Sequence, residues 1–235
     1  MTKGEQMRTS KMQNTKPNDR QSTSGFSLLE LLIVVAITAV MTAVAIPQMI
    51  AQRRLTRSTA VTRQIATQIR YARQLSMSQR DAITFQYDDT NKQIKIIDHN
   101  NNQPTNVACN LTGTAVLTAV NYPMTACAVV ATTIPLATDG LISSELSYGI
   151  PTTPVLPTAA LGDGISKTNL IGANLNITFQ PDGRVLDSSG NPANTAMYIY
   201  NTVQPQATAS AISIVGGSGR VKIWRYSSSA NVYAE

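Results

Sequence analysis

Hydrophobic residues run almost without a break from Phe26 to Ala51, and Glu30 is the only ionisable residue in that stretch. A helix rises about 1.5 Å per residue, so this run is long enough to cross a hydrocarbon core of about 30 Å. We therefore predict a transmembrane helix over residues 26–51. Pro47 lies near its end, where the missing backbone N–H and the proline ring are expected to kink the helix.

Apolar residues continue at helical spacing beyond this run. Between residues 48 and 80 they lie mostly three, four or six positions apart: Ile50, Leu55, Val61, Ile65, Ile69, Ala72 and Leu75. The spacing predicts that the helix continues over residues 52–80 and packs one face on a globular head. Seven arginines and no acidic residue lie from Arg53 to Arg80, and they are candidates for a subunit interface or for contact with membrane headgroups.

After Asp81 apolar residues alternate with polar ones, as in β-strands. AITFQY (82–87), the turn DDTN and KQIKII (92–97) predict a β-hairpin. Strand patterns return later, with turns at PDGR and GGSG among them: LNITFQ (175–180), AMYIYNT (196–202), AISIV (211–215) and RVKIWRY (220–226). Residues 81–235 therefore predict an antiparallel β-sheet head. The whole chain predicts an α+β fold in which the second half of one long helix packs on that sheet.

The residues from about 100 to 170 break the alternation. They are rich in Thr, Ala, Asn and Pro and hold only short apolar patches around Val116 and Val129, which predicts a loop-rich surface insertion. Both cysteines, Cys109 and Cys127, lie in it, and two cysteines are too few for a zinc site. In an oxidising compartment a bridge between them would remove about 3 kcal/mol of unfolded-state entropy. We predict a disulfide, with two buried free thiols as the alternative.

Residues 1–25 are polar and basic, unlike the segment that follows. Of the formal net charge of +6, this segment carries +3, from five Lys and Arg against Glu5 and Asp19. An ordinary secretory signal places its apolar core before the cleavage site, whereas here the polar segment stops at Gly25, directly before the apolar run. We predict a disordered leader. Basic residues flank the apolar run on both sides, so charge alone does not decide its orientation.

The stretch SGFSLLELLIVVAITAVMTAVAIP resembles the class III signal of type IV prepilins and pseudopilins. The resemblance rests on Gly25, on Phe26, on Glu30 as the fifth residue after the junction, on the apolar run and on Pro47. It implies that a prepilin peptidase cleaves the leader after Gly25 and that the new N-terminal residue, Phe26, is methylated. It also implies that the leader faces the cytoplasm, while the head lies in the periplasm or outside the cell.

Glu30 is the anomalous residue of the apolar run. A carboxylate inside hydrocarbon costs several kcal/mol, so it requires a partner. The resemblance implies an assembly role in which Glu30 meets the free amine of Phe26 on a neighbouring subunit. That amine exists only after cleavage, so cleavage and assembly would be linked. The alternative is that Glu30 snorkels from an ordinary membrane anchor.

The head resembles the GspH/FimT branch of this family. The shared features are YARQLSMSQR at the end of the helix, ITFQPDGRV, and SGRVKIW in the last hairpin. The implied function is a minor pilin or pseudopilin, a structural or priming subunit of a type IV pilus or a type II secretion filament. Its partners would be other pilin or pseudopilin subunits, the prepilin peptidase and, before assembly, the bacterial inner membrane that it crosses once.

The alternative function is that of a DNA-binding minor pilin for DNA uptake. Some FimT-like minor pilins carry a basic G-R-x-R motif in the final hairpin, and this chain has Gly219, Arg220, Val221 and Lys222 there. Lysine keeps the charge but lacks the bidentate fork of arginine. Arg220, Lys222 and Trp224 are expected on one face of the strand, where Trp224 would either stack on a base or lie in the core.

Composition and motifs point away from catalysis. Charged residues make up 14% of the chain and aromatics 5%, which is typical of exported β-rich proteins. The single histidine, His99, lies beside Asp98 in DHNNN and predicts a solvated turn instead of a metal or acid–base site. GGSG at 216–219 precedes a strand, whereas a phosphate-binding loop needs a following Lys-Ser/Thr and a helix. We expect no enzymatic activity, metal or cofactor.

Overall fold

The structure, a computed structural model, describes residues 25–100, 127–136, 143–157, 160–187 and 189–235. The chain divides into two compact units, Met1–Ile46 and Pro47–Glu235. A single helix, α1 (Leu28–Gln79), contains the boundary between them, and Pro47 lies inside it. Whether Pro47 bends the helix axis stays a prediction.

The first unit consists, in its described part, of the apolar segment of α1 with the short stretch before it. Every residue from 25 to 46 is exposed. α1 contains a window of 18 residues with a mean hydropathy of 2.5, which is long and apolar enough to cross a membrane. Its threonine hydroxyls are bonded within the helix: Thr38 donates to the Val35 carbonyl at 3.0 Å and Thr42 to the Thr38 carbonyl at 2.9 Å. Such local bonds suit polar side chains to a hydrocarbon environment.

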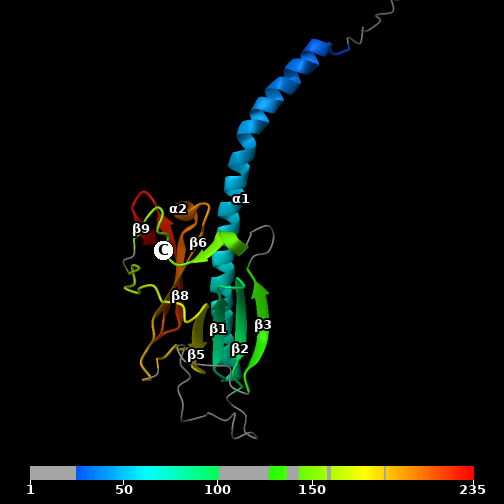
Figure 1. Ribbon diagram of the computed structural model, residues 1–235. Helices are drawn as coiled ribbons and strands as arrows, with labels where there is room; N and C mark the ends of the chain where they lie inside the picture. The colour runs from blue at the N-terminus through cyan, green and yellow to red at the C-terminus, as the bar shows by residue number, and fades with distance from the viewer. Residues whose placement is uncertain (1–24, 101–126, 137–142, 158–159, 188) are drawn as a thin grey trace, which may run out of the picture. The chain divides into compact units, whose positions relative to one another are not determined.

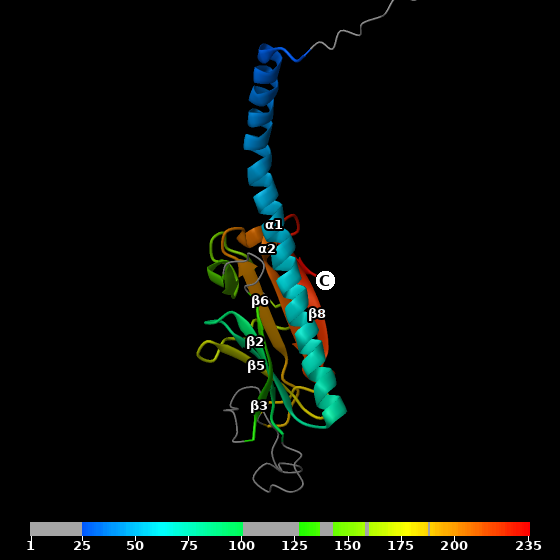
Figure 2. The same ribbon diagram turned by 90° about the vertical axis from the view of Figure 1, so that its right-hand side faces the viewer.

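In the second unit, the remaining part of α1 buries one face. Val61, Ile65, Ile69 and Ala72 are 5% exposed or less, and they recur at the intervals of four, four and three that one helix face requires. Figure 2 shows this part of α1 lying along the strands of the head. The predicted packing of the second half of the long helix on the head is therefore observed. Ile50, which the same pattern included, is 45% exposed.

Two antiparallel sheets form the head, where the sequence predicted one. The first has the order β3-β2-β1-β5 and comprises β1 (Ile83–Asp88), β2 (Gln93–Asp98), β3 (Val129–Pro135) and β5 (Asn174–Phe179). The second has the order β4-β6-β7-β8-β9 and comprises β4 (Leu146–Tyr148), β6 (Thr195–Asn201), β7 (Ser210–Val215), β8 (Arg220–Ser227) and β9 (Val232–Ala234). A short helix, α2 (Pro205–Thr208), which is labelled in Figure 1, precedes β7. A 3-10 helix (Ser143–Glu145) precedes β4.

The main core lies between α1 and the two sheets. Ile65 and Ile69 of the helix join the alternate residues of β1 (Ile83, Phe85, Tyr87) and inward-facing residues of the second sheet such as Met197 and Ile212. All of these side chains are fully buried, and each large apolar side chain contributes about 1.5–3 kcal/mol relative to an exposed position. The predicted strands thus form with the expected alternation.

A second cluster covers the opposite face of the second sheet. Leu156, Leu161 and Ile165 lie against residues of β6, β7 and β8, including Tyr198 and Trp224. Part of the region predicted to be a surface insertion therefore belongs to the core, and it also supplies β3 and β4. The sequence shows no period in this region because its buried apolar residues lie in irregular backbone. Pro, Gly and polar residues separate them, so they do not recur at a fixed interval. Val116 lies outside the described residues.

Candidate functional site

The predicted processing junction lies outside regular structure. α1 begins at Leu28, and the first helical bond runs from the Leu31 amide to the Ser27 carbonyl at 3.1 Å. Gly25 and Phe26 precede the helix, and Phe26 is 82% exposed. An exposed bond in irregular backbone suits a protease better than one inside a helix. The leader residues on the other side of the junction, 1–24, lie outside the described residues.

Glu30 lies in the first turn of α1, where the partial positive charge of the helix N-terminus favours a carboxylate by about 0.3–1 kcal/mol. Its neighbours on the helix are exposed apolar side chains, among them Leu29 and Leu31 at 64% and 62%. Within the ranges that the structure describes, no hydrogen bond or ion pair joins the Glu30 carboxylate to another residue. The carboxylate thus interrupts an apolar surface without a partner in the described part of its own chain.

Five of the six arginines of α1 fall into two groups. Arg54 donates to Glu145 at 3.3 Å, and Glu145 also accepts from the Asn201 amide at 3.0 Å. Arg73 donates to the Gly183 carbonyl at 3.1 Å and to the Ser218 carbonyl at 2.9 Å, so it joins the PDGR turn to the GGSG turn. These two side chains fasten the helix to the head. The second group is exposed and consists of Arg53, Arg63 and Arg70, although Arg70 also donates to the Val221 carbonyl at 3.4 Å. Arg57 of the helix is half-buried, and the exposed Arg80 follows the end of the helix.

Arg220 and Lys222 both lie near Glu235. The Lys222 ammonium is 2.7 Å from the Glu235 carboxylate, and its side chain is only 18% exposed. The Arg220 side chain is 66% exposed and reaches the same carboxylate at 4.0 Å. Arg220 is therefore the more accessible cation of the two, because Lys222 already has a close carboxylate partner in its own chain.

Trp224 lies in the core. It is 5% exposed, and its indole N–H donates to the Ser213 hydroxyl at 2.8 Å. The Ser213 hydroxyl in turn donates to Asp163 at 2.5 Å. The Lys222 ammonium lies 5.1 Å from the centre of the Trp224 ring. Of the two interpretations of Trp224, the structure favours the core residue, because base stacking would require the ring to leave this cluster.

The glycine of the basic hairpin motif has a structural role. Gly219 has a φ of +62°, and a Cβ placed on it would lie 2.2 Å from the Gly183 carbonyl oxygen and 2.4 Å from Nε of Arg73. Only glycine permits this approach of the two turns. The sequence marked PDGR and GGSG as turns, but nothing in it showed that the two turns touch or that Arg73 joins them.

His99 is buried, at 3% exposure, which corrects the predicted solvated turn. Its Nε2 lies 2.6 Å from the Thr84 hydroxyl, which lies 2.7 Å from the Thr178 hydroxyl of the next strand. Burial lowers the pKa of His99 to about 4, against the opposing charge of Asp98. The prediction was wrong because a polar segment such as DHNNN is usually exposed. Here its second residue, His99, follows β2 directly and is buried beside Thr84 of the neighbouring strand.

Cys127 takes part in a disulfide bond. Cys109 lies outside the described residues, so the pairing of these two cysteines stays a prediction. The Cys127 carbonyl accepts a hydrogen bond from the Asn100 side chain at 2.9 Å. This bond ties the start of the segment that carries β3 to the end of β2.

Comparison with known proteins identifies the N-terminal segment. Residues 20–46 match the prokaryotic N-terminal methylation motif. No curated protein matches the chain. Among solved structures, the chain is similar to the type IV minor pilin FimU of Pseudomonas aeruginosa, strain PAO1, with 16% sequence identity and a TM-score of 0.37, over 70% of this chain and 86% of that one. At that distance the likeness to FimU carries no argument about function.

The methylation motif contains most of the residues on which the predicted resemblance rests, and Pro47 lies one position beyond the matched range. Gly25, Phe26 and Glu30 all lie inside the matched range. The resemblance to type IV prepilins is therefore confirmed for this segment, and the chain is type IV pilin-like. The single apolar helix that follows is consistent with membrane anchoring.

Proposed function

We propose that this chain is a minor pilin or pseudopilin, a structural or priming subunit of a type IV pilus or a type II secretion filament. The observation that carries the proposal is Glu30: a carboxylate inside the methylation motif, on an exposed apolar helix, with no partner among the described residues of its own chain. A simple membrane anchor has no use for such a group, because the charge only raises the cost of insertion.

Cleavage would create the partner that Glu30 lacks. In the proposed sequence of events, the precursor crosses the inner membrane once, with its head in the periplasm. A prepilin peptidase then cuts after Gly25 and the amine of Phe26 is methylated. A methylated secondary amine remains cationic at neutral pH, so it can still pair with the Glu30 carboxylate of a neighbouring subunit. In a low-dielectric environment this pair is far stronger than in water.

The exposed apolar segment supports the same proposal. In the membrane, lipid covers the side chains from Leu28 to Ile46, and in a filament the corresponding helices of other subunits would replace the lipid. That transfer keeps apolar surface away from water throughout. The buried face of α1 beyond Pro47 keeps the head attached to the helix in both states.

Substitutions at Glu30 test the assembly role. We expect Glu30→Leu and Glu30→Gln to leave membrane insertion and leader cleavage intact and to remove the subunit from sheared or purified filaments. Ser27→Ala, also in the first residues of the proposed mature chain, is the matched control and should assemble normally. Incorporation of Glu30→Leu at the level of the unchanged protein would exclude the proposed role.

Substitution at the junction tests processing. Gly25→Ala should leave the leader attached, and mass measurement of protein extracted from membranes would detect the added residues. The unchanged protein should begin at Phe26 and carry one extra methyl group. Removal of the leader from Gly25→Ala at the normal rate would contradict the assigned junction.

DNA binding is the second candidate function. One observation favours it: Arg70, Arg73 and Arg220 line one groove of about 470 Å³ beside the GGSG turn. Phosphates could be neutralised there by Arg70 and Arg220, while Lys222 is engaged by Glu235 and Trp224 is buried. Two or three cations give weak, salt-sensitive binding.

Titration of the full chain in detergent with double-stranded DNA tests this second function. Binding should fall steeply with salt and should weaken with Arg220→Gln and with Arg70→Gln. Arg53→Gln removes an exposed arginine that is remote in sequence from the groove residues, and it serves as the control. Binding that ignores salt, or that weakens equally in all three variants, would remove DNA as a specific partner of this groove.

A further inference from the structure

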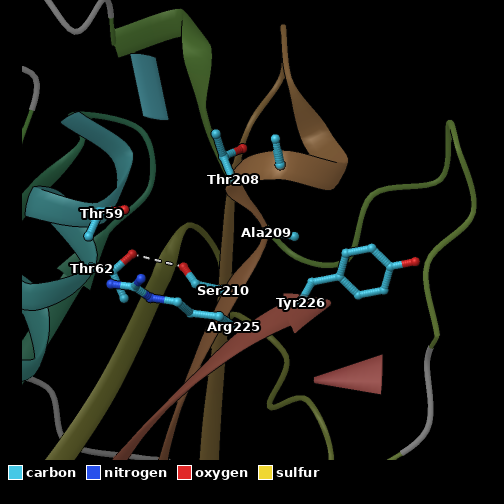
Figure 3. A pocket seen from close by; sticks show the side chains of 8 residues that line it. Thr59, Thr62, Thr208, Ala209, Ser210, Arg225 and Tyr226 are labelled. Atoms are coloured by element: carbon cyan, nitrogen blue, oxygen red, sulfur yellow. Dashed lines mark hydrogen bonds between the residues drawn. The ribbon is translucent and has the colours of Figure 1, made fainter. Parts of the chain in front are cut away.

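A small polar pocket lies where α1, the end of α2, β7 and β8 meet (Figure 3). Its volume is about 90 Å³. Most of its lining consists of hydroxyl-bearing side chains and one guanidinium: Thr59, Thr62, Thr208, Ser210, Tyr226 and Arg225. Among the described residues, no carboxylate lines it. The pocket shares no residue with the groove beside the GGSG turn, so it is a separate feature of the head.

Arg225 supplies the charge of the pocket. It is exposed, and it follows Trp224 on β8, so its side chain lies on the face of the sheet opposite the buried indole. In Figure 3 the Arg225 side chain extends from β8 toward Thr62 on α1. Among the residues that the structure describes, no hydrogen-bond or ion-pair partner of the Arg225 side chain is found. Its five N–H donors are therefore available to a ligand.

The hydroxyl protons of the pocket are mostly committed. Thr62 donates to the Ser58 carbonyl at 3.0 Å, so in the 2.8 Å contact between Thr62 and Ser210 the serine must be the donor. Thr208 donates to the Gln204 carbonyl at 2.6 Å. The Tyr226 hydroxyl donates to the Asn231 side chain at 2.8 Å.

Thr59 differs from its neighbours on the helix. Thr56 and Thr62 each donate to the carbonyl four residues earlier, at 3.1 Å and 3.0 Å, whereas within the described ranges no such bond is found for Thr59. Its hydroxyl can therefore donate into the pocket. Thr59 also lines the adjacent hollow that holds Arg63, so a second guanidinium adds positive potential on that side.

We propose that this pocket binds one oxyanion group, a carboxylate or a phosphate, with the Arg225 guanidinium and the Thr59 hydroxyl as its donors. Arginine matches the planar or tetrahedral arrangement of such oxygens with two parallel N–H bonds. The pocket has room for a single small group, and its remaining hydroxyl oxygens have lone pairs but no spare protons. The pocket therefore favours an anion. Its two available donors are the charged Arg225 guanidinium and the Thr59 hydroxyl, and its described lining contains no carboxylate that would repel an anion.

Anion titration of the full chain in detergent tests the proposal. Inorganic phosphate and acetate are added in separate series while sodium chloride keeps the ionic strength constant, and the backbone amide resonances of Thr59, Thr62 and Ser210 are followed by NMR. We expect saturable shifts confined to the pocket. The series with the lower Kd identifies the ligand as phosphate-like or carboxylate-like, and either result supports the site.

Three variants separate the pocket from general charge effects. Arg225→Gln should weaken binding about ten-fold or more, as expected for a lost charge-assisted pair, and Thr59→Val should weaken it about three-fold. Arg53→Gln removes an exposed arginine of α1 that does not line the pocket, and it should leave the Kd unchanged.

All three substituted side chains are at least partly exposed, so the variants should fold, which the spectra themselves verify. Absence of saturation, equal weakening by Arg53→Gln and Arg225→Gln, or an unaltered Kd in Thr59→Val would each overturn the proposal.

Discussion

Residues 25–46 and residues 47–235 use the same kinds of apolar side chain in opposite ways. In the first segment every residue is exposed, including Leu28 at 83% and Ile37 at 52%. In the second, Ile65 and Ile69 of the same helix are fully buried. One helix therefore carries two apolar surfaces, and only the second is covered by its own chain. The first apolar surface needs lipid or other subunits to cover it, and the proposed function as a filament subunit supplies both.

A matched pair of substitutions should show this difference most strongly. Ile69→Ala removes a fully buried side chain and should lower the free energy of unfolding of the head by about 2–5 kcal/mol, through lost burial and a cavity. Ile37→Ala makes the same chemical change at an exposed position of the other segment and should leave head stability unchanged. Denaturant unfolding of the full chain in detergent, followed by near-UV circular dichroism, measures both. Equal losses would mean that the two segments unfold as one unit.

Low pH should destabilise the head specifically, because the only histidine of the chain, His99, is buried there. Burial lowers the pKa of His99 from its ordinary 6.5 to about 4 in the folded head. The unfolded chain therefore takes up the proton first, and head stability should fall as the pH drops from 6.5 to 4, by about 3 kcal/mol in total. Above pH 6.5 this contribution is constant.

His99→Gln is the control for the effect of acid, since glutamine does not titrate and can still bond Thr84. The carboxylate of Asp88 does not confuse this window: burial opposes the shift, but hydrogen bonds from Asn91 and Gln93 and the charge of Lys95 hold its pKa well below the usual range. An identical stability profile for His99→Gln between pH 6.5 and 4 would contradict the assignment to His99.

Substitutions at two glycines of the head distinguish the cost of backbone strain from the cost of overpacking. Gly190 has a φ of +82°, and a Cβ added to it would have nothing within 4 Å, whereas a Cβ on Gly219 would overlap Gly183 and Arg73. Both Gly→Ala substitutions carry the cost of a left-handed conformation, about 1–2 kcal/mol. Gly219→Ala should cost about 1–3 kcal/mol more, through overpacking. Thermal unfolding of both variants gives the difference, and equal shifts in Tm would argue against the contact between the turns.

The smallest expected effect concerns the attachment of α1 to the head. Arg54→Gln breaks the ion pair with Glu145, whose side chain is only 12% exposed, and should cost about 1 kcal/mol in the free energy of unfolding. Arg53→Gln, at the preceding exposed position, should cost almost nothing. The difference between the two should shrink in high salt. A larger loss for Arg53 would reverse the division of the arginines into fastening and exposed groups.

The sequence predicted the helix and most of the strands well, for physical reasons. The long apolar run and the spacing of Val61, Ile65 and Ile69 are strong periodic signals, and β1, β2 and β5 to β8 each have at least six residues. β4 and β9 have only three residues each, which is too short for a period to be visible. The division into two sheets depends on pairings between distant segments, which no local pattern contains.

The candidate site was predictable where chemistry is encoded in consecutive residues. Gly25, Phe26 and Glu30 lie in one short motif, so the methylation motif could be recognised without a structure. The pocket of Arg225 and Thr59 joins residues from distant parts of the chain, and Arg225 in sequence looks like any exposed arginine. The burial of Trp224 could not be predicted for a similar reason. Trp224 shares its cluster with Leu156 and Leu161, which come from a region of the sequence without a periodic pattern.

The strand order has a consequence for how the head folds. β6, β7, β8 and β9 are neighbours in both sequence and sheet, so they can pair one after another through short connections. β1 and β5 also pair, in the register Ile83↔Phe179, but only after the long segment between them has been brought together. Local pairings form faster than distant ones, so we expect the C-terminal sheet to form early and to offer its inner face to the second half of α1. Folding of the head would then proceed backwards along the chain, from its last strands toward the N-terminal helix.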